Sequence, residues 1–345
     1  MKIRNKKYNN QNIKFKSVKI EGSKKSLINN LHSFSFKNIL IIILSLLSSV
    51  IILYIIIHFI IKFNNNKNIL NFDYSNYERN IITEEMFQKS GWNLTNEEIY
   101  FLNGIIRKFK PKKCLEIGVG KGDISILILN AIKDIPKSSL VSIDINKKLI
   151  EDHSKIIGYK VSKYFPNLSK NNWQLFTGEM PHKFLEKLNL KYDFVILDTS
   201  HTTPGEILNI IEIMPFLEEN SIIIFLNLIT HMKNAYIKDM DKFEIKKTHT
   251  SIFLMSTIAG KKIIKYDEKK LMENIGVIFL EKNQEKFYEN YFLLLICLWE
   301  NMLSDEEIYQ MRLFIEKYYK KEKLINIFEN AILYNKEFQK NFKLI

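Results

Sequence analysis

Residues 113 to 225 alternate between short apolar runs and longer segments with helical periodicity. The apolar runs are expected to be five strands, over Lys113–Ile117, Leu140–Ile145, Trp173–Thr177, Tyr192–Leu197 and Ser221–Phe225. The segments between them are expected to be helices, over Asp123–Ile132, Lys147–Phe165, Met180–Leu188 and Pro204–Met214. Strands that alternate with helices form parallel βαβ units. The pattern therefore predicts an α/β fold: a doubly wound, mostly parallel Rossmann-like sheet with helices on both faces.

The first expected strand ends in an acidic residue and a glycine-rich turn, Glu116-Ile-Gly118-Val-Gly120-Lys-Gly122. Glycine lets the backbone approach a ligand that a side chain would hold away. The spacing is not the Gly-X-Gly-X-X-Gly of dinucleotide-binding folds, and the Gly-Lys-Ser/Thr of a P-loop is missing. The turn therefore predicts a cofactor loop of another kind, although three close glycines can also form a tight turn in any doubly wound fold.

Ligands of a doubly wound sheet bind beyond the carboxyl ends of its strands. Polar or flexible side chains lie at the ends of the second to fifth expected strands or just after them: Asp144, Glu179, Met180, Asp198, His201 and Asn227. Asp144 comes 24 residues after Gly120, and its two oxygens can accept hydrogen bonds from both hydroxyls of a ribose. The alternative is that Asp144 caps the next helix, since Asp is a preferred N-cap residue.

Taken in order, four blocks resemble the branch of class I S-adenosylmethionine-dependent methyltransferases whose fourth strand ends in Asp-X-X-His. The blocks are Glu116–Gly122, Asp144, Thr177-Gly178-Glu179 and Asp198-Thr-Ser-His201. The resemblance covers residues 95 to 230. It implies that S-adenosylmethionine binds at Glu116, Gly118, Gly120, Gly122, Asp144, Glu179 and Met180. It also implies that strands near residues 261–266 and 275–281 close the sheet with an antiparallel edge.

Proteins similar to this branch include small-molecule and sugar O-methyltransferases and cephalosporin-hydroxylase-like proteins. The expected function is therefore O-methylation of a sugar, glycan precursor or small metabolite. Transfer to a hydroxyl needs a base. His201 is the expected base because its unperturbed pKa is near neutrality, and Asp198 would orient it, bind acceptor hydroxyls or hold a metal. The alternative for His201 is a structural role at the start of the following helix.

The resemblance also raises the question of a divalent cation such as Mg²⁺. In many relatives the fifth strand ends in an Asp that can join the Asp after the fourth strand as a metal ligand. This chain has Asn227 at that place, which offers a carbonyl oxygen but no charge. A cation is still expected at Asp198 and Asn227, but it would be bound more weakly because one negative charge is missing.

The chain carries a long apolar run ahead of this domain. Residues 39 to 61 hold 23 positions without a charge, enough at about 1.5 Å per residue to cross a bilayer. We therefore expect a single-pass membrane protein that binds lipid through this span and through a basic N-terminal tail. The first 37 residues carry ten Lys or Arg against one acid, which predicts a cytoplasmic N-terminus. The side on which the catalytic domain lies stays open.

The expected organisation has five parts: a basic tail (1–37), a transmembrane helix (38–62), a stalk (63–94), a Rossmann-like methyltransferase domain (95–283) and a helical C-terminal extension (284–345). The net charge of +13 resides mostly in the tail, so no nucleic-acid partner is expected. Aromatic rows in the extension predict a packed cap or a homodimer face. Two other functions stay open: a non-catalytic membrane-tethered binding module, and a metal-dependent cephalosporin-hydroxylase-like enzyme.

Overall fold

The computed structural model describes residues 70–170, 172–228, 250–267 and 272–342. The chain divides into two compact units, Met1–Asn71 and Phe72–Ile345, and the first lies almost wholly outside the described residues. Within those residues, no helix combines the length and the apolar character that crossing a bilayer requires. This finding contradicts the predicted single-pass membrane localisation. The segments on which that prediction rested, 1–37 and 38–62, themselves lie outside the described part of the chain.

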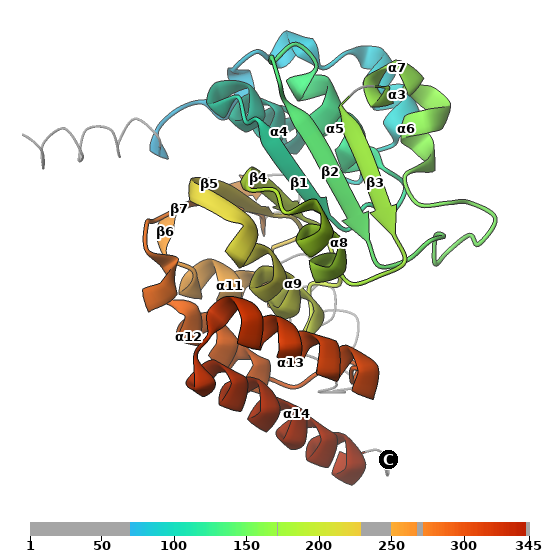
Figure 1. Ribbon diagram of the computed structural model, residues 1–345. Helices are drawn as coiled ribbons and strands as arrows, with labels where there is room; N and C mark the ends of the chain where they lie inside the picture. The colour runs from blue at the N-terminus through green and yellow to red at the C-terminus, as the bar shows by residue number, and fades with distance from the viewer. Residues whose placement is uncertain (1–69, 171, 229–249, 268–271, 343–345) are drawn as a thin grey trace, which may run out of the picture. The chain divides into compact units, whose positions relative to one another are not determined.

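The second unit is built around a seven-stranded sheet with the order β3-β2-β1-β4-β5-β7-β6 (Figure 1). Its strands are β1 (Lys113–Ile117), β2 (Ser139–Asp144), β3 (Trp173–Thr177), β4 (Tyr192–Leu197), β5 (Leu217–Phe225), β6 (Gly260–Asp267) and β7 (Met272–Leu280). Strands β1 to β5 are parallel, whereas β7 runs antiparallel to both β5 and β6. The prediction of a doubly wound, mostly parallel sheet with an antiparallel edge is confirmed.

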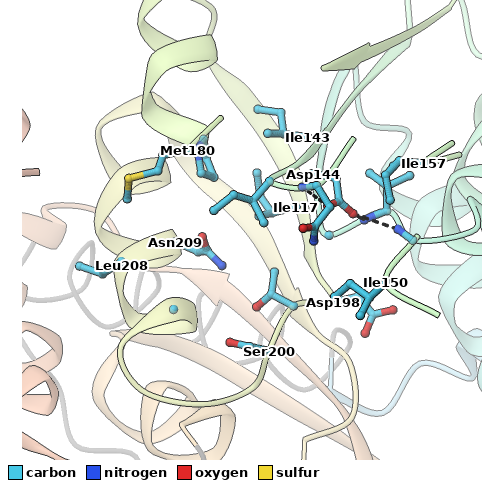
Figure 2. Close-up of a pocket in the computed structure, with 18 of the residues that line it drawn as sticks. Ile117, Ile143, Asp144, Ile150, Ile157, Met180, Asp198, Ser200, Leu208 and Asn209 are labelled. Carbon is cyan, nitrogen blue, oxygen red and sulfur yellow. Dashed lines mark hydrogen bonds between the residues drawn. The ribbon is translucent and has the colours of Figure 1, made fainter. Parts of the chain in front are cut away.

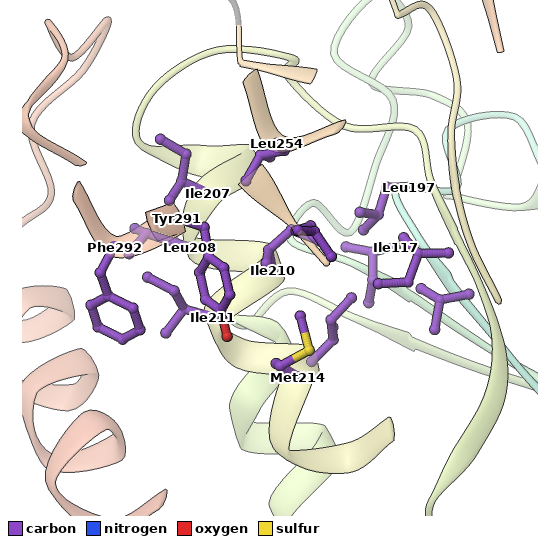
Figure 3. Close-up of a cluster of buried hydrophobic side chains, with 14 of the residues drawn as sticks. Ile117, Leu197, Ile207, Leu208, Ile210, Ile211, Met214, Leu254, Tyr291 and Phe292 are labelled. Atoms are coloured by element: carbon purple, nitrogen blue, oxygen red, sulfur yellow. The ribbon is translucent and has the colours of Figure 1, made fainter. Parts of the chain in front are cut away.

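The two faces of the sheet carry separate apolar cores, because successive side chains of a strand point to opposite faces. In β1, Cys114 packs on one face with α4 (Asn96–Phe109) and α5 (Asp123–Ile132). Leu115 and Ile117 pack on the other face with α8 (Pro181–Leu188) and α9 (Gly205–Ile213). Figure 3 shows this second core, in which Ile117 and Leu197 face the apolar side of α9. The ends of β1 and β4 are therefore held from both sides.

The segment between β2 and β3 differs from the prediction of one helix over Lys147–Phe165. It is a loop with an isolated bridge between Lys148 and Ile156, followed by the short helices α6 (Tyr159–Tyr164) and α7 (Pro166–Ser169). The loop folds back on the glycine-rich turn: Gly158 N donates to Gly120 O at 2.8 Å, and Lys160 N donates to Lys121 O at 3.1 Å. Gly158 has φ +70°, which ends a helix in most sequences. Backbone contacts with the turn thus outweigh the helical pattern of the segment.

The compact unit starts at Phe72, ahead of the expected boundary near residue 95. Two 3₁₀ turns (Tyr74–Asn76 and Arg79–Ile81) and α3 (Glu84–Ser90) precede α4. Tyr74 is only 2% exposed, and its carbonyl oxygen occupies the place that a Cβ of Gly104 would need. Glycine at position 104 therefore lets the first 3₁₀ turn lie directly against α4, and this part of the expected stalk belongs to the domain.

The C-terminal extension is helical and shares the core of the α8/α9 face. It comprises two 3₁₀ turns (Gln284–Lys286 and Leu293–Ile296), α12 (Tyr288–Phe292), α13 (Asp305–Tyr319) and α14 (Glu322–Phe342). Two further elements belong to the sheet domain: α11 (Ser251–Thr257), which precedes β6, and the 3₁₀ turn Met214–Phe216, which follows α9. Tyr319 Oη donates to the carbonyl of Ile211 in α9 at 2.7 Å. Trp299 and Phe328 are almost fully buried. The extension is thus packed onto the sheet domain rather than attached as a separate body.

Candidate active site

A cavity of about 460 Å³ lies at the carboxyl ends of β1, β2 and β4. Its walls combine the glycine-rich turn, the start of the β2–β3 loop, the β4–α9 loop, one face of α9 and the residues leading into α13. Figure 2 shows Asp144 and Asp198 on this cavity, with Met180 and Asn209 across from them. Of the residues predicted for the site, the structure brings Gly118, Gly120, Asp144, Met180 and Asp198 to the cavity wall; these are the ones that a bound ligand would touch.

The glycine-rich turn is tied to β2 through Asp144. Its Oδ2 accepts the backbone N–H groups of Val119 (3.0 Å) and Gly120 (3.1 Å), drawn as dashed lines in Figure 2, and its Oδ1 accepts that of Asn146 (2.8 Å). Asp144 thus fixes the shape of the turn as well as lining the cavity. A carboxylate oxygen has two lone pairs, so ligand hydroxyls can still bind beside these backbone contacts.

The three glycines of the turn serve different ends. Gly118 has φ +83°, and a Cβ there would overlap the carbonyl oxygen of Asp198. Gly120 has φ +50° and would place a Cβ in open space, with no protein atom within 4 Å; the space is free for a ligand. Gly122 precedes α5, and a Cβ there would come within 2.9 Å of Val161. Gly122 therefore serves packing and does not line the cavity.

Besides Gly122, two other predicted cofactor residues, Glu116 and Glu179, lie away from the cavity wall. Glu116 is fully buried on the α5 face, where its Oε2 accepts hydrogen bonds from Ser125 Oγ (2.6 Å) and Ser142 Oγ (2.5 Å). Burial raises the pKa of Glu116 to about 8. Glu179 is exposed and lies near Lys183, with 3.6 Å between the carboxylate and the ammonium group. Glu116 is thus a buried carboxyl that is mostly protonated at neutral pH and supports the core, whereas Glu179 lies on the surface.

His201 lies behind the cavity wall, between two carboxylates. It is 3% exposed, with Nδ1 at 3.3 Å from Glu206 Oε1 and Nε2 at 3.4 Å from Asp198 Oδ1. Glu206 is fully buried and also accepts hydrogen bonds from Thr250 Oγ1 (2.8 Å) and Ser251 Oγ (2.8 Å). The β4–α9 loop is therefore anchored on a buried network of polar groups.

The charge of His201 follows from these neighbours. Burial alone would lower the pKa of His201, but the hydrogen bonds and charges of Asp198 and Glu206 outweigh it and raise the pKa to about 9. At neutral pH the imidazole is then protonated and has no free lone pair with which to accept a proton. The raised pKa and the buried position between two carboxylates argue against the predicted role of His201 as the base. They fit a cation that holds Asp198 in place at the cavity, where the Asp198 side chain is 33% exposed.

Asn227 lies beside Asp198, as the sequence pattern predicts. Its Nδ2 donates to Asp198 Oδ1 at 3.2 Å. Asp198 is therefore surrounded by hydrogen-bond donors, the Asn227 amide and the His201 imidazolium, rather than by further oxygen ligands of the kind that Mg²⁺ prefers. Across the described ranges, no group of three or more His, Cys, Asp or Glu could hold a metal ion. The residues present do not fit the expected cation at Asp198 and Asn227.

Several residues on the cavity wall were not predicted. They are Ser200 in the β4–α9 loop, Asn209 and Glu212 on α9, and Leu303 and Glu307 from the C-terminal extension. The α9 residues could have been found from their spacing, since Gly205, Asn209 and Glu212 recur on one helix face. Nothing in the local sequence indicates that residues 303 and 307 reach the cavity, because that contact depends on how the extension packs.

A family model described as a methyltransferase domain matches residues 115–227 of the chain. No curated protein matches it in sequence. Among solved structures, the O-methyltransferase TomG from Streptomyces achromogenes, in complex with SAM, is 13% identical, with 58% of this chain and 91% of that chain covered and a TM-score of 0.43. The O-methyltransferase from Bacillus cereus, in complex with SAH, is 13% identical (57% and 89% covered, TM-score 0.42). The SAH-bound Podospora anserina methyltransferase PaMTH1 is 16% identical (58% and 89% covered, TM-score 0.41).

Proposed function

We propose that the chain, whose residues 115–227 match a family model described as a methyltransferase domain, transfers the methyl group of S-adenosylmethionine to a hydroxyl of a sugar, glycan precursor or small metabolite. One observation carries the proposal. The glycine-rich turn, Asp144 and the half-buried Asp198 share one cavity at the carboxyl ends of the strands, where doubly wound folds bind their ligands.

The cofactor end of the cavity is the part lined by the glycine-rich turn, Asp144 and the β2–β3 loop. Apolar side chains there (Ile117, Ile143, Leu149, Ile150 and Ile157) surround the open space beside Gly120. An apolar wall beside the Asp144 carboxylate suits a nucleoside, because the ring is buried against the wall and the ribose hydroxyls donate to the carboxylate. We assign the ribose to Asp144 and the apolar rim near Met180 to the base.

When bound, S-adenosylmethionine supplies a methyl group on a sulfonium, so that the new C–O bond forms as the S–C bond breaks and the sulfonium becomes a neutral thioether. The acceptor hydroxyl must lose its proton in this reaction. Asp198 is the carboxylate at the cavity wall beyond the glycine-rich turn, and it takes the proton in our proposal. His201 acts as a positioning residue, because its imidazolium faces Asp198 Oδ1 from behind the wall.

Titration of the full chain with S-adenosylhomocysteine by isothermal calorimetry tests the cofactor site. We expect saturable binding that Asp144→Asn weakens by about tenfold, equivalent to about 1.4 kcal/mol, since the substitution removes the charge that orders the turn and faces the ribose. Asp305→Asn is the matched control, because the Asp305 side chain is 95% exposed and lies outside the cavity lining. Absence of binding by the unaltered chain would defeat the proposed function.

A further inference from the structure

The cavity extends beyond Asp198 to a second region, the acceptor end, which we define by Ser200, Asn209, Glu212, Leu303 and Glu307. Asn209 and Glu212 lie three residues apart on α9, and Leu208 and Gly205 complete the same face of the helix. The opposite face of α9 carries Ile207, Ile210 and Ile211, which are buried in the apolar core. The helix therefore turns its mixed polar face to the cavity and its apolar face to the sheet (Figures 2 and 3).

Two polar groups at the acceptor end are free to bind a ligand. The Ser200 hydroxyl and the Asn209 amide line the cavity, and neither makes a hydrogen bond to a residue in the described ranges. In Figure 2, Asn209 projects from α9 toward the side of the cavity that carries Asp198. An amide offers both donor and acceptor groups, and so does a hydroxyl. These two side chains can therefore orient a hydroxylated molecule next to the proposed base.

Glu212 adds a third polar group at the inner wall. Its Oε1 contacts His182 Nδ1 at 2.6 Å, while its Oε2 is buried and has no hydrogen-bond partner in the described part of the chain. A fully buried carboxyl oxygen without a partner is costly. A hydroxyl group of a ligand that reaches this oxygen would remove that cost.

The charges that line the cavity have one sign. Asp198 and Glu307 are acidic, and no lysine or arginine among the described residues lines the cavity. The imidazolium of His201 does not offset this, because Asp198 and Glu206 both contact it. Like charges brought together in a partly dry site repel each other strongly. A phosphate or carboxylate in the acceptor would face this repulsion without a cation to bind it.

The C-terminal extension is held at the acceptor end by contacts with the β4–α9 loop. Glu300 N donates to the carbonyl of Thr203 at 2.8 Å, and Thr202 Oγ1 donates to Glu300 Oε2 at 2.7 Å. These bonds place Leu303 and Glu307 at the cavity wall. The same Glu307 carboxylate closes the capping box of α13 with Ser304. Its position is therefore fixed by the helix start, and the extension supplies a fixed negative charge to the site.

Building on the proposed function, we propose that the acceptor is a hydroxylated molecule that is uncharged or cationic, oriented by Ser200 and Asn209. In this assignment Glu307 is a specificity-determining residue that the C-terminal extension contributes to select against phosphate and carboxylate groups. Sugars linked to a phosphate or diphosphate are thereby excluded from the acceptors of the proposed function.

Two catechols of opposite charge test the inference: dopamine, a cation, and 3,4-dihydroxybenzoate, an anion. Each is titrated into the full chain saturated with S-adenosylhomocysteine, and binding is followed by calorimetry. We expect dopamine to bind at least about tenfold more tightly, and we expect Glu307→Gln to narrow that ratio by about threefold or more through the loss of one charge. Glutamine can still close the capping box, so the start of α13 is preserved.

Glu306→Gln is the control, because Glu306 is the exposed neighbour in the same helix turn and lies outside the cavity lining. It should leave the ratio unchanged. The inference is overturned if the anionic catechol binds as tightly as dopamine, if neither catechol binds, or if Glu306→Gln narrows the ratio as much as Glu307→Gln does. Saturation with S-adenosylhomocysteine is measured first: its failure overturns the proposed function and this inference together, whereas cofactor binding without charge discrimination overturns this inference alone.

Discussion

The two ends of the cavity are built in different ways. The cofactor end is held by hydrogen bonds to the backbone of the glycine-rich turn from nearby segments: the Asp144 carboxylate accepts from Val119 N and Gly120 N, and Gly158 N donates to Gly120 O. The acceptor end is assembled from the β4–α9 loop, α9 and a C-terminal extension that lies about a hundred residues further along the chain, as in the bond between Thr202 and Glu300. The first end depends on backbone conformation, and the second depends on how separate elements pack.

Of the substitutions proposed, Gly118→Ala should have the largest effect, because it should disrupt the glycine-rich turn at the cofactor end. The new methyl group would overlap the Asp198 carbonyl oxygen in a left-handed backbone conformation, and we expect a loss of stability of about 3 kcal/mol or more together with loss of S-adenosylhomocysteine binding. Urea unfolding and calorimetry measure both quantities.

Gly120→Ala is the matched control for Gly118→Ala. Its Cβ meets no protein atom, so the stability loss should be only that of the backbone conformation, about 1 kcal/mol, while the affinity for the cofactor falls because the methyl group enters the ligand space. Equal stability losses for the two variants would show that close approach to β4 does not shape the turn.

Asp198→Asn tests the proposed general base, which lies between the cofactor end and the acceptor end. We expect kcat for methyl transfer to fall by about 10²- to 10⁴-fold, the usual contribution of a general base, with the affinity for S-adenosylhomocysteine unchanged. Asp305→Asn, at an exposed position, serves as the control. His201→Gln should lower kcat by less than Asp198→Asn and leave KM nearly constant, as expected of a positioning residue. If His201→Gln is the more damaging of the two, the imidazole rather than Asp198 is the base.

Glu116→Gln tests whether the buried carboxyl at the start of the glycine-rich turn is protonated in the folded chain. Burial raises the pKa of Glu116 from 4.5 to about 8 in the folded chain, so between these values the folded form keeps a proton that the unfolded form has lost. The stability of the unaltered chain is therefore expected to fall as the pH rises from about 4.5 to about 8, while glutamine does not titrate. In urea unfolding, we expect the free energy of unfolding of Glu116→Gln, relative to that of the unaltered chain, to rise by about 2 kcal/mol or more across this range. A constant difference at every pH would mean that Glu116 is ionised in the folded chain.

The contrast between the ends also explains what could be predicted from the sequence. The alternation of apolar runs and helices is a local signal, and so is the spacing of Gly118, Gly120 and Asp144; both led to the observed sheet and to residues on the cavity wall. The helix expected over Lys147–Phe165 was wrong, because tertiary backbone contacts with the glycine-rich turn override helical periodicity. His201 followed the right motif, but its pKa depends on Glu206, whose burial no local pattern reveals.

Asn209→Ala is expected to have the smallest effect and to act on the acceptor end alone. The Asn209 amide lines the cavity and makes no hydrogen bond within the described residues, so its loss should cost little stability. We expect KM for the acceptor to rise by about tenfold, the value of one hydrogen bond to a bound ligand, with S-adenosylhomocysteine affinity and kcat nearly unchanged. Asn290→Ala is the control, since Asn290 is exposed on α12 and does not line the cavity. A loss of cofactor affinity in Asn209→Ala would show that the cofactor extends along α9, and the two ends would then be one site rather than two.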